Sequence, residues 1–277
     1  MDRIKVTYIF SELEPWNEVV IAALSELGFD SFVEIESGIE AYINENEFDT
    51  DLLDVGILKE IQELVQLHVS IEKIPFQNWN AVWESDFKPV FVEDKLTIIA
   101  PFHDPSIVVG LPVIIQPQMS FGTGHHQTTW MMSKILLDMS KVPTKVLDMG
   151  TGTGVLAIIS EKLGAENVLA IDIEPWSVEN TIENAERNNC KNIISKCGDI
   201  DLIKGHNFDL ILANINKNIL KSHLEDYSSA MNQGAKLALS GFFETDVDEL
   251  ISEATKFGLK FDSLVTKETW AAIILIK

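Results

Sequence analysis

The stretch VLDMGTGTGVLAI, residues 146–158, decides the fold class of this chain. A run that suits a buried strand precedes glycines at 150, 152 and 154, and a helical pattern of apolar residues follows them. A strand that ends in a glycine-rich turn and continues into a helix is typical of an α/β sheet that binds a ligand at the carboxyl ends of its strands. The stretch therefore predicts an α/β domain with a ligand site at the turn.

The spacing of the three glycines narrows the kind of ligand. A dinucleotide fingerprint would put a third small residue at position 155, which is Val155 here. The turn also lacks the Gly-Lys-Ser/Thr of the phosphate loop in nucleotide hydrolases. The G-x-G-x-G pattern of Gly150, Gly152 and Gly154 instead favours the turn that holds the amino-acid end of S-adenosylmethionine, which is the cofactor we expect.

Acidic residues stand at the ends of three successive predicted strands. Asp148 comes just before the turn, where it can meet the cofactor's ammonium group directly or through water. Asp172 ends the next strand, where an acid accepts hydrogen bonds from both ribose hydroxyls, and Glu174 is the near alternative. Asp199 follows the third strand and is expected at the adenine amino group. A single acid at such a place is as easily a helix cap, but three acids beside one glycine turn indicate a binding site.

The second half of the chain alternates strand and helix patterns. Helices are expected at 127–139, 153–163, 176–188, 217–231 and 245–257, and strands at KVLDM, NVLAID, NIISKC, FDLILAN and AKLALSG. Such alternation predicts a parallel sheet with helices on both faces. The last two strands, KFDSLVT and WAAIILIK, are joined only by KET, so they must pair antiparallel. A mostly parallel, seven-stranded sheet that ends in this way is the Rossmann-like methyltransferase fold.

The first 75 residues predict a separate and smaller fold. Strand patterns at 4–10, 31–35, 39–43 and 68–74 surround two amphipathic stretches, 16–27 and 52–67. The order βαββαβ suggests an α+β ferredoxin-like sheet with two helices on one face. We find no catalytic constellation in this part of the sequence.

These patterns divide the chain into three parts. Residues 1–75 are expected to form the ferredoxin-like domain, 76–105 a linker with connecting strands, and 106–277 the methyltransferase domain. The segment PFQNWNAVWESDFKP, at the start of the linker, is rich in aromatic residues. Trp79 and Trp83 are four residues apart in it and are expected to pack together on one helical turn.

Composition and charge exclude several classes of protein. The 277 residues carry 21 Lys and Arg against 43 Asp and Glu, and a net charge of -22 opposes binding to a phosphate backbone, so we expect no direct nucleic-acid partner. Two cysteines suit a reducing cytoplasm and complete neither a disulfide framework nor a zinc site. No apolar run approaches the ~18 residues of a membrane span. We therefore expect a cytoplasmic protein with no membrane partner and no bound metal.

Several stretches together carry a specific resemblance. FGTGHHQTT at 121–129, the glycine turn at 146–158, AIDIEP and LILANI resemble the PrmA family, the methyltransferases of large-subunit ribosomal protein L-eleven (L11). The likeness extends to NWNAVWESDFKP and ETWAAIILIK, and so covers most of the chain from about residue 76 onward. The first domain matches in its predicted element order more than in its residues. The resemblance implies that this domain recognises the basic ribosomal protein and that the linker lets it reorient over the catalytic domain.

The resemblance also implies residues of the pocket. In the PrmA family the Phe, His and Thr of the first Gly-Thr-Gly stretch line the cofactor pocket, which carries over to Phe121, His126 and Thr128. Asn214, at the end of the strand FDLILAN, lies where its side-chain carbonyl can hold an amine beside the cofactor. The sequence Asn-Ile-Asn there differs from the Asn-Pro-Pro-aromatic motif of enzymes that methylate glutamine or adenine amino groups, and argues against both activities.

The sequence leaves the role of His126 undecided. His126 is either a wall of the pocket or a general base, since unperturbed histidine titrates near ~6.5. A metal site with His125 is not expected, because adjacent residues rarely converge on one ion and no clear third ligand is nearby. His206 and His223 lie in polar surroundings and are expected to be exposed to solvent.

The sequence thus predicts an S-adenosylmethionine-dependent protein-lysine N-methyltransferase that modifies lysine ε-amines, and the N-terminal α-amine, of L11 and acts as a monomer. Asn214 and His126 are the candidate catalytic residues. A lysine, with a pKa near ~10.4, must lose its proton before its nitrogen attacks the sulfonium methyl, and an apolar cleft lowers that pKa. Two other functions remain open: a small-molecule methyltransferase with an accessory domain, and a catalytically silent cofactor-binding scaffold.

Overall fold

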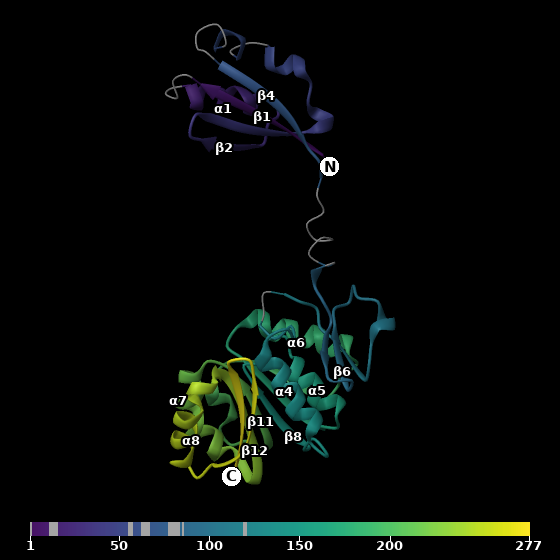
Figure 1. Ribbon diagram of the computed structural model, residues 1–277, viewed down its shortest axis with the longest axis vertical. Coiled ribbons are helices and arrows are strands. Elements are labelled where there is room, and N and C mark those ends of the chain that lie inside the picture. Colours follow the sequence, from purple (N-terminus) through teal and green to yellow (C-terminus); the bar gives the residue numbers. More distant parts are fainter. Residues whose placement is uncertain are drawn as a thin grey trace. The chain divides into compact units, whose positions relative to one another are not determined.

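The computed structural model describes residues 2–10, 16–54, 58–61, 67–76, 84, 86–118 and 121–277. The chain divides into two compact units, Met1–Asp86 with one described sheet and Phe87–Lys277 with two (Figure 1). Trp79 and Trp83, which the sequence pairs on one helical turn, lie outside the described residues. Within the described part, no helix is both long enough and apolar enough to span a membrane.

The first unit is built on a four-stranded antiparallel sheet with the strand order β2-β3-β1-β4. Its elements are β1 (Arg3–Phe10), α1 (Trp16–Glu26), β2 (Ser31–Ile35), β3 (Gly38–Asn44) and β4 (Leu67–Ile74). Alternate residues of β1 are buried, among them Tyr8 and Phe10, and they belong to one core with Val20 and Leu24 of α1. The small α+β domain that the sequence predicts is therefore confirmed. The stretch 52–67 lies partly outside the described residues.

The second unit begins with a small sheet of three short strands. These are β5 (Val90–Val92), β6 (Leu96–Ile99) and β7 (Leu111–Ile114), with β5 antiparallel and β7 parallel to β6. All four residues of β6 are buried, which explains the apolar run LTII. The strands expected between the two domains therefore belong to the second compact unit, and β7 leads directly into the first Gly-Thr-Gly stretch.

A seven-stranded sheet forms the centre of the second unit, in the order β10-β9-β8-β11-β12-β14-β13. Its strands are β8 (Lys145–Met149), β9 (Asn167–Asp172), β10 (Ile193–Cys197), β11 (Phe208–Asn214), β12 (Met231–Phe243), β13 (Lys260–Lys267) and β14 (Trp270–Ile276). β14 pairs antiparallel with both β12 and β13, while the other pairs are parallel. The mostly parallel sheet with an antiparallel end is thus confirmed.

Helices cover both faces of this sheet, as Figure 1 shows for α4 and α5 against α7 and α8. The helices are α4 (Gln127–Asp138), α5 (Val155–Lys162), α6 (Pro175–Arg187), α7 (Lys217–Ser229) and α8 (Val247–Thr255). The side chains of neighbouring residues in β8 point to opposite faces of the sheet, because side chains alternate along a strand. Val146 packs into the core shared with α4 and α5, and Leu147 into the core shared with α7 and α8.

The strand order reverses at β8, which lies between β9 and β11. The chain runs outward from β8 through β9 to β10, and then returns to the other side of β8 with β11. In open parallel sheets, ligands bind beyond the carboxyl ends of the strands at such a switch point. Met149, Asp172 and Asn214 are the last residues of β8, β9 and β11, and they mark this place.

Candidate active site

A cavity of about 610 Å³ lies at the carboxyl ends of β8, β9 and β11. The structure brings nine of the residues predicted from the sequence together in its lining: Phe121, His126, Thr128, Gly150, Gly152, Asp172, Glu174, Asp199 and Asn214. Two predicted residues, Asp148 and Gly154, are not part of the lining. The remaining lining residues, which the sequence analysis did not place in the site, are Met149, Ile171, Ile173, Trp176, Ser177, Ile215, Asn216, Ile219, His223, Gly241 and Trp270.

The glycine turn is bound to the end of β9. The backbone N–H groups of Gly150 and Thr151 both donate to the carbonyl oxygen of Ile171, at 2.8 and 3.0 Å. One carboxylate oxygen of Asp172 accepts from the N–H of Gly152 at 2.9 Å, and the other accepts from the N–H of Glu174 at 3.1 Å. A carboxylate has about four acceptor positions, so Asp172 is oriented by the turn and still has capacity for ligand hydroxyls.

The two Gly-Thr-Gly stretches pack against each other. The N–H of Thr153 donates to the carbonyl oxygen of Phe121 at 3.0 Å, and its hydroxyl donates to the carbonyl oxygen of Gly122 at 2.6 Å. A Cβ added at Gly152, whose φ is 57°, would lie 2.1 Å from the same Phe121 oxygen. Glycine is therefore required at 152 for the approach of the neighbouring loop, and the first stretch forms a wall over the second.

Asp148 lies inside the protein and supports the turn from within. Its side chain is 1% exposed, and its Oδ2 accepts from the hydroxyl of Thr151 at 2.7 Å and the N–H of Ala157 at 3.1 Å. Burial raises the pKa of Asp148 to about 7, against the smaller opposing effect of those two hydrogen bonds. The expected meeting of Asp148 with the ligand is not supported as a direct contact, because the carboxylate is turned toward its own loop and the start of α5.

The raised pKa of Asp148 predicts a pH-dependent stability. In the unfolded chain this carboxyl loses its proton near 3.8, whereas in the folded protein it keeps the proton until about 7. Its contribution to stability is therefore greatest at low pH and falls as the pH rises through that window, by up to about 4 kcal/mol. Asp148→Asn mimics the protonated acid and does not titrate. We therefore expect the stability of this variant, relative to that of the wild type, to be higher at about pH 8 than at about pH 5.

Chemical denaturation of both proteins, without cofactor, at the two pH values measures this difference. Other carboxylates are common to both chains, so their pH effects cancel in the comparison. A difference between variant and wild type that is the same at both pH values would contradict the assignment.

His126 is the N-cap of α4. Its Nδ1 accepts from the N–H of Thr128 at 3.3 Å and lies 2.7 Å from the Thr128 hydroxyl, while the ring packs beside Phe121 and Trp270. Burial lowers the pKa of His126, and the charge of Glu268 opposes this in part. A neutral imidazole whose Nδ1 accepts carries its proton on Nε2, so neither nitrogen is a ready base. The geometry favours the wall of the pocket over general-base catalysis.

The adjacent His125 has different partners. Its Nδ1 lies 3.1 Å from the hydroxyl of Thr123 and its Nε2 lies 2.7 Å from the carbonyl oxygen of Lys88. The two rings are therefore engaged separately and do not converge on one point. Among the described residues, no group of three or more His, Cys, Asp or Glu is placed to hold a metal ion.

Asn214, in the lining of the cavity, carries a buried polar atom that no described residue pairs with. Its Nδ2 donates to the hydroxyl of Thr129 at 3.4 Å, which orients the amide. Its Oδ1 is buried and has no hydrogen-bond partner within the described part of the chain. A buried acceptor without a partner costs free energy of about 1–3 kcal/mol. The unpaired carbonyl of a cavity-lining residue is suited to a hydrogen-bond donor.

The sequence missed cavity residues that come from helices and from the last strand. Ile219 and His223 both line the cavity and are four residues apart on α7. That spacing puts them on the same face of a helix, and it was the signal in the sequence that could have placed His223 in the site. The expectation that His223 is solvent-exposed is wrong: it is half-buried, and burial lowers its pKa. Trp270, the first residue of β14, packs beside both His126 and Phe243.

Comparisons with known proteins agree with this geometry. Residues 17–277 match the family model described as ribosomal protein L11 methyltransferase (PrmA). A ribosomal protein L11 methyltransferase of Porphyromonas gingivalis is 43% identical over 266 residues, covering 94% of this chain and 91% of that protein. The corresponding protein of Phocaeicola vulgatus is 38% identical over 265 residues, with 95% and 94% coverage.

Solved structures resemble the chain as well. The crystal structure of a ribosomal protein L11 methylase from Lactobacillus delbrueckii subsp. bulgaricus superposes with a TM-score of 0.63 at 26% identity. It covers 69% of this chain and 99% of that one. A methyltransferase from Pyrococcus furiosus, with a TM-score of 0.50 and 22% identity, shares the fold.

Proposed function

Since the chain belongs to the ribosomal protein L11 methyltransferase (PrmA) family, we propose that it methylates lysine ε-amines, and the N-terminal α-amine, of ribosomal protein L11. Membership makes it an S-adenosylmethionine-dependent protein methyltransferase. The observation that carries the choice of an amine acceptor is the unpaired, buried Oδ1 of Asn214 in the lining of the cavity. An amine N–H is the hydrogen-bond donor that suits it.

The described residues fit S-adenosylmethionine. Gly152 allows close backbone packing at the turn, Asp172 is oriented with spare acceptor positions, and Asp199 caps the short helix after β10 at the cavity edge. When bound, the cofactor would supply a methyl group on a positively charged sulfur. An amine nitrogen would bond to the methyl carbon as the C–S bond breaks, with its electron pair going to the leaving sulfur. Phe121, His126, Thr128 and Trp270 line one wall of this place.

The main task of the protein is to present a neutral amine. Free lysine has a pKa near ~10.4, and transfer into an apolar cavity lowers that pKa because burial disfavours the charged form. Asn214 Oδ1 accepts one N–H of the amine, and the carbonyl of Ile215, the next residue of the lining, is the candidate for a second. Holding the nitrogen in line with the methyl group then supplies the largest part of the rate.

The first compact unit is proposed as the domain that recognises the ribosomal protein. Among the described residues, its four-stranded sheet contributes nothing to the lining of the cavity, whose residues all belong to Phe87–Lys277. The proposal includes the domain limits 1–75, 76–105 and 106–277 and a monomeric state. It also includes a cytoplasmic location, since the substrate is made in the cytoplasm.

Transfer of label tests the proposed function. The protein is incubated with methyl-labelled S-adenosylmethionine and purified, unmethylated L11, and the products are mapped by mass spectrometry. We expect label on lysine ε-amines and on the N-terminal amine. Label on other side chains would overturn the amine assignment, and label found only on small molecules would exclude the protein substrate.

The acidic charge predicts a salt-dependent encounter with the substrate. With a net charge of -22, the protein attracts a basic ribosomal protein at long range. Raising the salt concentration from about 50 to about 300 mM should raise the KM for L11 by roughly threefold or more, because mobile ions screen exposed charges. The KM for S-adenosylmethionine should change less. Equal insensitivity of the two KM values would remove electrostatic steering.

A further inference from the structure

Helix α6 buries polar side chains where a helix ordinarily buries an apolar stripe. Asn180, Thr181, Asn184 and Asn188 are all almost completely buried. The three asparagines follow one another at intervals of four, so they share one face of the helix. Burying amides is costly unless their hydrogen bonds are made. The partners of these side chains therefore indicate what the face is for.

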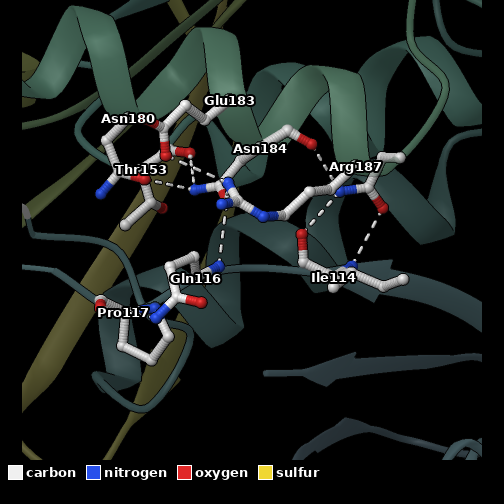
Figure 2. A network of polar contacts seen from close by, with 9 residues as sticks. Ile114, Gln116, Pro117, Thr153, Asn180, Glu183, Asn184 and Arg187 are labelled. Carbon is white, nitrogen blue, oxygen red and sulfur yellow. Dashed lines mark hydrogen bonds and ion pairs between the residues drawn. The ribbon is translucent and has the colours of Figure 1, made fainter. Parts of the chain in front are cut away.

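Asn184 is fully buried and uses every hydrogen-bonding position of its amide (Figure 2). Its Nδ2 donates to the carbonyl oxygen of Thr153 at 3.0 Å and to Oδ1 of Asn180 at 2.6 Å. Its Oδ1 accepts from the backbone N–H of Gln116 at 2.9 Å and from Arg187 at 3.4 Å. An amide offers two donors and two acceptor positions, and all four are occupied here.

Two of these partners lie beside the cavity on separate segments, and neither is itself a lining residue. Thr153 is part of the glycine turn, and Gln116 lies just beyond β7 on the segment 111–118, which we call the strap and which leads to the first Gly-Thr-Gly stretch. Thr153 in turn binds Phe121 and Gly122 through its N–H and hydroxyl. Figure 2 shows Asn184 reaching from α6 toward the strap residue Gln116, with Thr153 beside it.

We infer that Asn184 is a positioning residue for cofactor binding: its amide joins the strap to the glycine turn and thereby holds the wall that carries Phe121. Only a side chain that both donates and accepts can make this joint, because the strap presents an N–H and the turn presents a carbonyl oxygen. Asn184 is not part of the cavity lining, so it acts through Thr153 and the strap. The inference rests on the cavity being the cofactor site.

Asn188, the C-cap of α6, supplies a matched control. It is also buried, and it binds the strap through both backbone groups of Ile114, accepting at 2.9 Å and donating at 2.6 Å. Its remaining bond is to the carbonyl oxygen of Asn184, within α6. It anchors the strap to α6 but does not reach the turn. A substitution there should disturb packing and stability without separating the two Gly-Thr-Gly stretches.

The test compares Asn184→Leu with Asn188→Leu, since leucine keeps the branching of asparagine but has no polar atoms. We expect both variants to lose thermal stability, and only Asn184→Leu to raise the KM for S-adenosylmethionine and the Kd for S-adenosylhomocysteine, by about tenfold. Its kcat at saturation should stay within about threefold of the wild type, because the acceptor site is untouched. Asn184→Asp, which keeps the acceptor for Gln116 but has no donor for Thr153, should weaken binding in the same way.

Hydrogen exchange in the wild-type protein gives a second measure that does not depend on any variant. Binding of S-adenosylhomocysteine should slow exchange of the Gln116 amide more than that of the Ile114 amide. Equal KM changes in the two leucine variants, or no change at the Gln116 amide, would overturn the inference. If the wild type does not bind S-adenosylhomocysteine at all, the cofactor assignment itself fails, which is a distinguishable result.

Discussion

Replacing Asn214 with alanine is expected to lower kcat roughly 100-fold while leaving the Kd for S-adenosylhomocysteine within about threefold of the wild type. The reason is the position of Oδ1, which is buried and has no partner in the described part of the chain until an amine arrives. The amide cannot turn freely, because its Nδ2 is bound to Thr129. Without this acceptor the amine loses its orientation toward the methyl group, and misplacement of a reacting atom by about 1 Å costs roughly 100-fold.

Asn216→Ala is the matched control for this prediction. Asn216 lines the same cavity two residues away, but its side chain accepts from the N–H of Asn218 as the N-cap of α7. Its loss should cost about 1 kcal/mol of stability and little of kcat. Single-turnover kinetics with L11 and calorimetry with S-adenosylhomocysteine separate the two effects. A kcat for Asn214→Ala within about threefold of the wild type would sink the assigned role.

Gly152→Ala should abolish most cofactor binding. The added Cβ would lie 2.1 Å from the carbonyl oxygen of Phe121, a backbone atom that cannot move away by a change of rotamer. The two Gly-Thr-Gly stretches must then separate, which breaks the bonds of Thr153 to Phe121 and Gly122. We expect a loss of about 2 kcal/mol or more of stability from overpacking and a rise of roughly 30-fold or more in the KM for S-adenosylmethionine.

Gly258→Ala is the control that separates the collision with Phe121 from the cost of placing alanine in a left-handed backbone conformation. Gly258 has a φ of 78°, also in the left-handed region, and an added Cβ there would meet no described atom within 4 Å. Alanine pays about 1–2 kcal/mol for a left-handed conformation, so both variants carry that cost and only Gly152→Ala carries the collision. Titration with S-adenosylhomocysteine measures the difference. Equal affinities in the two variants would show that the approach of Phe121 does not control binding.

The parts of the site that the sequence predicts are those with a local signal. Gly150 and Gly152 follow a strand pattern directly, and Asp172 and Asn214 end two further strand patterns. In a parallel sheet all such ends lie at one edge, so position along the chain is enough to place them together. The antiparallel pairing of β13 and β14 was predictable in the same way, from the short connector between them.

The direction of a side chain at the same strand end was not predictable. Asp148 and Asp172 both stand at strand ends beside the turn, yet one is buried under the turn and the other lines the cavity. Enclosure under the turn is what raises the pKa of Asp148, because burial disfavours the charged form of a carboxyl. His223 is a similar case, since its polar neighbours in sequence lie on the other faces of α7.

The sequence by itself determined the α/β class, the antiparallel pairing of the last two strands, the cofactor turn and the family resemblance, because each depends on short patterns and their spacing. Only the tertiary structure decided what the first Gly-Thr-Gly stretch does. Phe121 and Thr153, 32 residues apart, are joined by a hydrogen bond, and Asn184 on α6 binds both Thr153 and Gln116 of the strap. Contacts of this kind leave no local period in the sequence, because the partner groups are backbone atoms that every residue carries.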